Sequence, residues 1–310
     1  MATLVRVMLI VFTSMFAVVF GKDYKKTKEV NQLEDETWKK PGFIGFVANF
    51  ADTLGIGSFA IVVAMSKALK LNIKDKHIPG MLNVSCTIPA VLEALIFITS
   101  VKVDPITLIS LLIAAAAGSV IGAKIISKLD EAIVQVVMGI ALFVTGIVMF
   151  CGLPWINLMP GGGTALGLTG AKLVIGIVGN FILGALMTAG IGLYAPCMAM
   201  LYLLGMSAKA AYPIMMGSCA MLLPFSGMEF IREGQYPRKS SLAITIGGIF
   251  GVLLAVLFVN SLSMDLLKVL VICVIFYTAA TMLKTGVTKL KSNKSECKAK
   301  SKDLTDLNID

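Results

Sequence analysis

The sequence predicts an all-α polytopic membrane protein made of two homologous, inverted repeats, each with a broken, re-entrant helical segment. Hydrophobic residues make up 57% of the chain and charged residues 15%, against roughly 25% charged in a typical soluble domain. Two similar blocks, IGFVANF at 44–50 and IGIVGNF at 175–181, are each followed by Gly-Ile-Gly, at 55–57 and 190–192. The composition therefore indicates the class, and the repeated blocks indicate the organisation.

Long apolar segments recur along the whole chain, and most reach the ~20 residues that cross a bilayer. They lie near 4–20, 43–66, 79–99, 104–123, 132–151, 173–204, 211–231, 240–262 and 266–283. The net charge of +9 comes from lysines and arginines in short loops and in the tail, which is how membrane proteins mark their cytoplasmic side. The expected partner is therefore the lipid bilayer, and no nucleic-acid-binding surface is visible.

The pattern divides the chain into six stretches. These are an N-terminal hydrophobic helix (1–21), a charged loop (22–41), a first membrane repeat (42–152), a Gly/Pro-rich linker (153–171), a second membrane repeat (172–284) and a polar cytoplasmic tail (285–310). The segment at 4–20 stands outside the duplication, and a cleaved signal peptide is one interpretation of it. More lysines follow this segment than precede it, which favours a retained helix with its N-terminus outside.

The duplication continues beyond the Gly-Ile-Gly breaks. Residues 79–93 and 213–229 each contain a proline, a Ser-Cys pair, a second proline and then a glutamate. Further along, three more positions correspond between the two halves: Pro105 to Pro237, Gly118 to Gly251 and Asp130 to Asp265. The two halves are therefore expected to share one helical plan.

Lysine positions favour a hairpin at each Gly-Ile-Gly break. If each broken segment crossed the membrane once, the lysines at 67–76 would lie opposite those at 22–40, against the positive-inside rule. If each segment re-enters, the loops at 21–41, 67–77, 124–128 and 232–239 share the cytoplasmic side with the tail. Each half then has an odd number of crossings, so the halves are inverted, as in carriers that work by alternating access. Single crossings remain the alternative.

The Gly-Ile-Gly breaks are the expected centre of a binding site. Glycine lets the chain leave helical geometry, and a helix N-terminus exposed at such a break presents N–H groups to an anion. Close helix packing is the alternative for these glycines. The candidate binding residues at the breaks are Asn49, Gly55, Gly57, Ser58, Asn180, Gly190, Gly192 and Tyr194.

The matching Pro-Ser-Cys segments add a second set of candidates, which are Asn83, Ser85, Cys86, Ser218 and Cys219. Their amides and hydroxyls can donate to oxyanions, and a thiol is a weak donor. For the asparagines structural bracing is an equal alternative, and for the cysteines helix packing is the commoner role. These residues are therefore site candidates on the strength of the repeat.

Acidic residues inside apolar segments carry the largest cost, so their presence indicates a partner or a function. Asp52 lies between Asn49 and Gly55 and is the first candidate for proton coupling, with Glu93 as a second. Glu229 has Arg232 at i, i+3 spacing, which is typical of a structural pair.

Several classes are disfavoured. With one histidine, His77, no HExxH zinc site and no Ser–His pair inside the membrane can be formed. The six cysteines form no CxxC pair, so neither a metal nor another cofactor is expected. Because the nucleophile, metal and paired acids that an intramembrane enzyme needs are missing, the chain is not predicted to be an enzyme. No ATPase P-loop occurs, so energy would come from a gradient or a separate protein. The oligomeric state is left open.

The runs ADTLGIGSFAIVVAM, PGMLNVSCTIPAVLEAL and AAAAGSVIGAKIISKL resemble the TauE/SafE family of membrane permeases, the sulfite exporter family. The resemblance spans residues 40–290 and rests on ordered blocks. The family's first block usually continues with more glycines and a proline, whereas Ser58 and Phe59 follow Gly57 here.

The resemblance implies a secondary transporter in the cell membrane. Its substrate would be a small organic or sulfur-containing anion such as sulfite or sulfoacetate, in many cases exported, with a proton or another ion as coupling partner. The alternative is a non-transporting membrane assembly subunit, and substrate-dependent flux distinguishes the two.

Overall fold

The computed structural model describes residues 2–55, 57–74, 77–122, 131–151, 153, 156, 163–188, 192–261, 269 and 272–291, and its regular elements there are all helices. This confirms the all-α prediction. Five described helices are long and apolar enough to cross a membrane, namely α1, α4, α8, α10 and α11. The helices α3, α5, α7 and α9 are apolar but shorter.

The described elements follow one another in the order that the apolar segments predict. They are α1 (Ala2–Glu29), α2 (Lys39–Thr53), α3 (Ser58–Ala68), α4 (Ile78–Ser100), α5 (Pro105–Ala117), the π-helical turn η2 (Gly118–Gly122), α7 (Glu131–Cys151), α8 (Gly170–Thr188), α9 (Tyr194–Leu203), α10 (Ala208–Arg232) and α11 (Arg238–Ser261), followed by a helix over residues 272–291.

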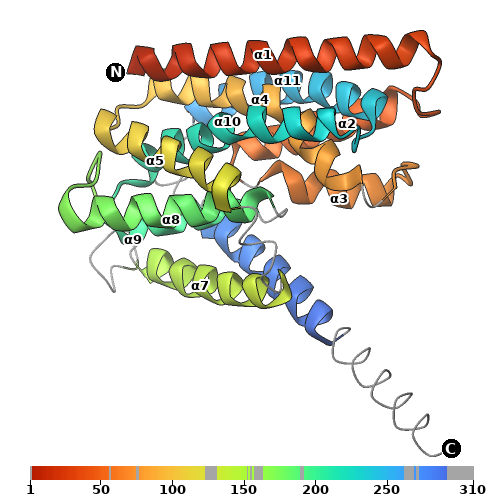
Figure 1. Cartoon of the computed structure of the whole chain (residues 1–310). Coiled ribbons are helices and arrows are strands. Elements are labelled where there is room, and N and C mark those ends of the chain that lie inside the picture. The colour runs from red at the N-terminus through yellow and green to blue at the C-terminus, as the bar shows by residue number, and fades with distance from the viewer. Residues whose placement is uncertain are drawn as a thin grey trace, which may run out of the picture.

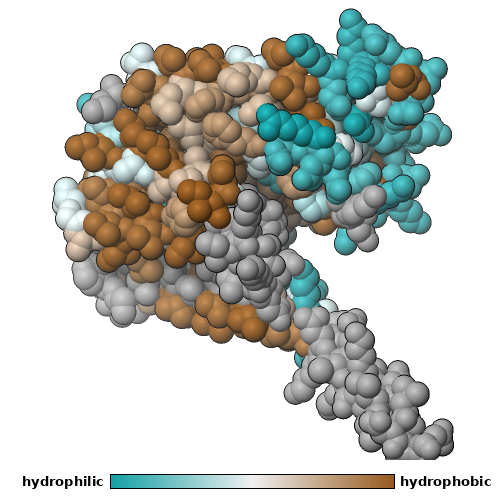
Figure 2. All heavy atoms as spheres, in the orientation of Figure 1, coloured by the Kyte–Doolittle hydropathy of each residue, from teal (hydrophilic) through white to brown (hydrophobic). Residues whose placement is uncertain are grey.

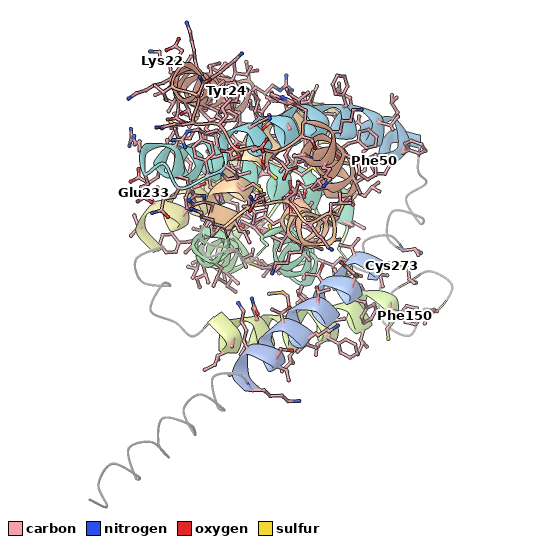
Figure 3. All side chains as sticks on the ribbon, turned by 90° about the vertical axis from the view of Figure 1, so that its right-hand side faces the viewer. Lys22, Tyr24, Phe50, Phe150, Glu233 and Cys273 are labelled. Carbon is pink, nitrogen blue, oxygen red and sulfur yellow. The ribbon has the colours of Figure 1, made fainter. Side chains whose placement is uncertain are left out.

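The bundle is centred on α4 and α10, which pack against each other and are largely buried (Figure 1). Helix α1 crosses them on one side, where the rings of Phe12 and Phe225 lie 4.8 Å apart. Helix α7 and the helix over 272–291 form a pair below the bundle, joined by the rings of Phe143 and Phe276 at 5.5 Å (Figure 3). The centre of the bundle is therefore enclosed by helices from both halves of the chain.

Helices α2 and α3 form a hairpin. The start of α2 lies beside the end of α3, where Lys40 Nζ donates to the carbonyl of Leu69 at 3.4 Å. The chain reverses at Gly55 and Gly57, whose φ angles are +93° and +83°. Glycine adopts this left-handed region without steric cost, so the tip of the hairpin depends on these two residues.

Helices α8 and α9 form a second hairpin, which opens at the other end of the bundle. There Ser207 N–H, just after α9, donates to the carbonyl of Ala165, just before α8, at 3.0 Å. The same end holds the α4–α5 turn, because Asp104 N–H donates to the carbonyl of Leu166 at 2.8 Å. Helix α4 begins near the open end of the first hairpin and finishes here, so the two hairpins enter the bundle from opposite ends.

Polar residues gather at the end where the first hairpin opens (Figure 2). The carboxylate of Glu34 accepts hydrogen bonds from the backbone N–H groups of Arg238 and Lys239 at the start of α11. The Arg238 guanidinium lies 2.8 Å from the Asp23 carboxylate, which also accepts from the Tyr236 hydroxyl. Burial and this hydrogen bond raise the pKa of Tyr236 above its usual value.

These contacts explain one boundary that differs from the expected one. Helix α1 continues through the charged residues to Glu29, whereas the N-terminal helix was expected to end at residue 21. Lysine and glutamate are good helix formers, and Lys25 and Glu29 pair at i, i+4 spacing. The contact of Asp23 with Arg238 fixes this last part of the helix against the bundle.

Glycines bring the first helix of each hairpin unusually close to a helix of the other half. A Cβ atom on Gly45 of α2 would lie 2.1 Å from the carbonyl oxygen of Ile244 in α11. A Cβ on Gly184 of α8 would likewise lie 2.1 Å from the carbonyl oxygen of Ala115 in α5. Only glycine allows such backbone contact, which is typical of membrane helix interfaces.

Candidate functional site

The tips of the two hairpins meet at a buried cavity of about 30 Å³. It is lined by Asp52, Gly57, Ser58 and Phe59 from the first hairpin, Met187, Gly192, Leu193 and Tyr194 from the second, Ala90 from α4, and Cys219 and Leu223 from α10. Ala90 and Cys219 lie near the midpoints of their helices, so the cavity is at the centre of the bundle. Its volume suits about one water-sized molecule, and the tips must separate before an oxyanion of several atoms can enter.

Asp52 both lines the cavity and shapes the first tip. Its Oδ1 accepts a hydrogen bond from the backbone N–H of Ser58 at 2.6 Å, and its side chain is buried. Ser58 is the first residue of α3, whose N-cap Gly57 offers no side-chain acceptor. A carboxylate is favourable at the positive end of a helix, so Asp52 takes over the capping of α3 from one turn upstream.

Glu93 joins the tips of the two hairpins. Its side chain is fully buried in α4; Oε1 accepts from the Thr53 hydroxyl at 2.9 Å, and Oε2 accepts from the Tyr194 hydroxyl at 3.2 Å. Its carboxyl also interacts electrostatically with that of Asp52. The structure thus brings together the two acids that the sequence singled out for proton coupling.

The second tip presents the N-terminus of α9 to the cavity. The helix begins at Tyr194, its N-cap Leu193 has no side-chain acceptor, and both residues line the cavity. Pro196 in the first turn has no N–H to be satisfied. Among the described residues no side chain caps the remaining N–H groups of this turn, which makes this tip suited to an anion. Gly192 lines the cavity, whereas Gly190 falls outside the described residues.

The two matched asparagines lie behind the cavity rather than in its lining. Asn180 Nδ2 donates to the carbonyl of Leu111 at 2.7 Å and to Ser218 Oγ at 2.8 Å, which ties α8 to α5 and α10. Asn49 Nδ2 donates to the carbonyl of Gly45 in its own helix at 2.9 Å. Both side chains are fully buried, and within the described residues neither Oδ1 has a hydrogen-bond partner. These contacts fit the alternative in which the asparagines brace the helices rather than bind the substrate.

In the two Ser-Cys pairs the cysteines lie nearer the cavity than the serines. Cys219 lines it, with Sγ 3.6 Å from the sulfur of Met187, and Cys86 interacts with Ser58 and Asp52 at the first tip. Ser218 is held by Asn180, as described above. Ser85 Oγ lies 3.8 Å from the Sγ of Cys86. One thiol thus lines the cavity, and the other interacts with Ser58, a residue of its lining.

Two further candidates also lie away from the cavity lining. Asn83 donates to the carbonyl of Pro79 and accepts from the Ser226 hydroxyl at 2.7 Å, so it joins α4 to α10. Gly55 shapes the turn, and a Cβ there would lie 3.4 Å from the Tyr212 hydroxyl.

Other residues of the site were not singled out from the sequence. The Thr53 hydroxyl, one of the donors to Glu93, lies next to Asp52 in the chain, and that adjacency was its only signal. Pro89 has no N–H, so the carbonyl of Ser85, four residues earlier in α4, has no partner within the helix. The hydroxyl of Thr245 in α11 donates to this carbonyl at 2.9 Å instead. The apolar lining residues Ala90, Met187 and Leu223 have no sequence signal that separates them from ordinary core.

Metal binding has no support in the described part of the chain, where no group of three or more His, Cys, Asp or Glu side chains could hold an ion. The cavity lining itself presents the carboxyl of Asp52, the hydroxyls of Ser58 and Tyr194 and the thiol of Cys219.

Residues 1–149 match the family described as Sulfite exporter TauE/SafE. The matched part contains the first hairpin and α4, and so includes Asp52 and Glu93. No curated protein and no solved structure shows significant similarity to the chain. Members of the matched family are membrane permeases, that is, transporters rather than enzymes. Residues 1–149 are therefore similar to the sulfite exporter TauE/SafE family of membrane transporters, and the five long apolar helices are those of a multi-pass membrane protein.

Proposed function

We propose that the chain is a secondary carrier that exports a small organic or sulfur-containing anion, such as sulfite or sulfoacetate, by alternating access. The observation that carries this proposal is the meeting of two oppositely opening hairpin tips at one buried central cavity. Broken helices that meet at the middle of the bilayer form the substrate sites of several carrier folds. The uncapped N-terminus of α9 supplies N–H donors for the anion.

The contacts between the halves support the proposal that they are inverted repeats. Helix α2 packs along α11, and its counterpart α8 packs along α5 and η2, while the counterparts α4 and α10 pack against each other. The matched glycines Gly118 and Gly251 each lie against a backbone carbonyl of the other half, at Phe181 and Phe46. Two halves that exchange conformations would exchange an inward opening for an outward one.

The lining favours a sulfur-containing anion. Cys219 and Met187 both line the cavity, and their sulfur atoms lie 3.6 Å apart. Sulfur is soft and polarizable, so this wall suits the sulfur centre of sulfite, while the N–H groups of α9 suit its oxygens. Chloride, which has no sulfur and a smaller charged surface, is the natural comparison ion.

Flux through proteoliposomes tests the proposal. We expect the purified protein to release preloaded sulfite faster than protein-free vesicles do, and to release chloride no faster. Gly57→Leu and Gly192→Leu should abolish this release while the protein stays in the membrane, because both residues line the cavity and a leucine side chain would enter it. Gly21→Leu on α1, where a Cβ meets nothing within 4 Å, is the control and should release sulfite normally.

The alternative, a non-transporting assembly subunit, makes the opposite prediction. It would give no anion-dependent flux by the wild-type protein for sulfite, sulfoacetate or any other small anion tested. Such a result, obtained with folded protein, would refute the carrier.

The orientation of the hairpins has its own test. In a background without reactive native cysteines, Lys70→Cys and Gly234→Cys should be shielded from an impermeant reagent applied to intact cells, because both lie at the lysine-rich end. Leu166→Cys lies at the opposite end, is exposed, and should be labelled. Labelling of Lys70→Cys from outside would contradict the proposed orientation.

A further inference from the structure

Two carboxyl groups from different helices lie together at the centre of a membrane protein. Asp52 is 3% exposed at the end of α2, and Glu93 is 0% exposed in α4. They interact electrostatically and are linked through Tyr194, whose hydroxyl donates to Glu93 and whose side chain lines the same cavity as Asp52. Two negative charges this close would repel each other strongly where water is excluded.

The titratable groups that face the pair do not offset this repulsion. They are Cys86 of α4, Tyr194 of α9 and Cys219 of α10, all of them neutral in their protonated forms. None of the described residues forms a salt bridge with Asp52 or Glu93. The other charged residues of the helices packed against α4 include Arg6, Lys22, Asp23, Lys25, Lys26, Lys28 and Glu29 of α1, Lys39 and Lys40 of α2, Lys67 of α3, Lys209, Glu229 and Arg232 of α10, and Arg238 and Lys239 of α11.

The hydrogen bonds around the pair distinguish its oxygens. Both oxygens of Glu93 accept, from Thr53 and from Tyr194. Oδ1 of Asp52 accepts from Ser58 N–H. The Asp52 carboxyl also interacts with the hydroxyls of Ser58 and Tyr194, and of the two acids it is the one that lines the cavity.

We propose that Asp52 and Glu93 form one proton-binding site, and that this site must hold a proton on Asp52 before the substrate anion can bind. The inference rests on the proposed anion carrier, because its consequence is cotransport. A charged Asp52 would place a negative group in the lining that the anion must enter, whereas a protonated Asp52 removes that repulsion. No bond other than O–H forms or breaks: the proton arrives from the water on one side and leaves with the anion on the other.

Tyr194 links this proton site to the movement of the second hairpin. It is the first residue of α9, so separation of the tips withdraws its hydroxyl from Glu93. Glu93 then loses one of its two donors, which changes how strongly the pair holds its proton. Opening of the site and release of the proton are thereby coupled through one hydrogen bond.

Infrared spectroscopy of the protein in lipid vesicles tests the proton without any substrate. We expect a C=O stretch from a protonated carboxylic acid in the wild-type protein at neutral pH, and loss of that signal in Asp52→Asn. The asparagine Oδ1 can still accept from Ser58 N–H, so the cap of α3 is preserved. Glu229→Gln alters an exposed carboxyl and should leave the signal unchanged. Absence of any wild-type signal that Asp52→Asn removes would overturn the proposal.

Binding of sulfite against pH gives the second test. If one proton must bind with each anion, log Kd should rise by about one for each pH unit on the alkaline side. This slope should flatten in Asp52→Asn, and Tyr194→Phe, which keeps the ring but loses the donor to Glu93, should displace the pH range over which it appears. A slope that is unchanged in both variants would overturn the proposal.

The two hypotheses fail in different ways. Sulfite flux that is independent of pH, with no protonated Asp52 in the spectrum, would leave the carrier standing and reject the proton site. A protonated Asp52 in a protein that moves no anion would support the proton site and reject the carrier. Should Asp52→Asn not fold, a pH titration of the infrared signal in the wild-type protein decides the question, because a proton site must lose that signal at alkaline pH.

Discussion

Replacement of Gly45 by alanine should destabilise the interface between α2 and α11. A Cβ atom there would lie 2.1 Å from the carbonyl oxygen of Ile244 and 2.6 Å from its Cα. Both are backbone atoms, so no side-chain rotation relieves the overlap and the helices must move apart. Overpacking of this kind costs ~1–3 kcal/mol, partly offset by the ~1 kcal/mol that alanine gains over glycine in a helix. The net loss is therefore up to about 2 kcal/mol, and the severe overlap with backbone atoms places it toward that upper value.

Gly42→Ala is the matched control, because it lies on the same helix and faces the same partner. Its Cβ would lie 3.7 Å from the carbonyl oxygen of Ala243, an ordinary contact. Only the helix-propensity gain should remain, so Gly42→Ala should be neutral or slightly stabilising. The assay is the thermal unfolding midpoint of the purified protein in detergent. Equal midpoints for the two variants would refute the account of this interface.

Three further variants test other contacts by the same assay. Gly57→Ala should lower the unfolding midpoint, because an alanine at a φ of +83° costs ~1–2 kcal/mol. The cause is backbone conformation alone, since a Cβ there meets nothing within 4 Å. An unchanged midpoint would argue against a rigid tip. Thr245→Val should cost ~1–3 kcal/mol by leaving the Ser85 carbonyl without its donor, a conclusion that stability equal to the wild type would reject. Asp23→Asn should lower the unfolding midpoint by weakening the contact with Arg238. Lys25→Ala alters an exposed ion pair and should leave the midpoint unchanged. Similar effects of the two variants would count against a role for α1 in stability.

Sequence periodicity and composition predict the helices well, because the requirement for ~20 apolar residues per crossing leaves a strong signal. The turn at Gly55 and Gly57 was also predictable, since both adopt φ angles that favour glycine. The sequence indicated a shared role for Asp52 and Glu93 but not that they lie close together. Residues 41 positions apart meet through helix packing rather than through local structure.

The directions of side chains could not be predicted in the same way. Ser85 and Cys86 are neighbours in the sequence, yet of the two Cys86 interacts with the first tip. The contacts of α4 with α10 and α11 fix the orientation of α4 about its own axis, and this decides which side chain faces the tip. Asn83 belongs to the same segment and instead joins Ser226. The π-helical turn at Gly118–Gly122 likewise has no distinct sequence signal. Such details depend on which helix faces which, and a single sequence records that only weakly.

Helix α1 lies outside the two proposed repeats, and no described helix of the second half matches it. It packs on α4 and α10 from one side only, and its end is held by Arg238 at the start of α11. Two halves related by the duplication alone would make the inward-facing and outward-facing states equal in free energy. An additional helix attached to one face would remove that equality, so a carrier with the proposed inverted repeats would have a preferred resting orientation. Release of Asp23 from Arg238 would shift that preference as well as the stability of the fold.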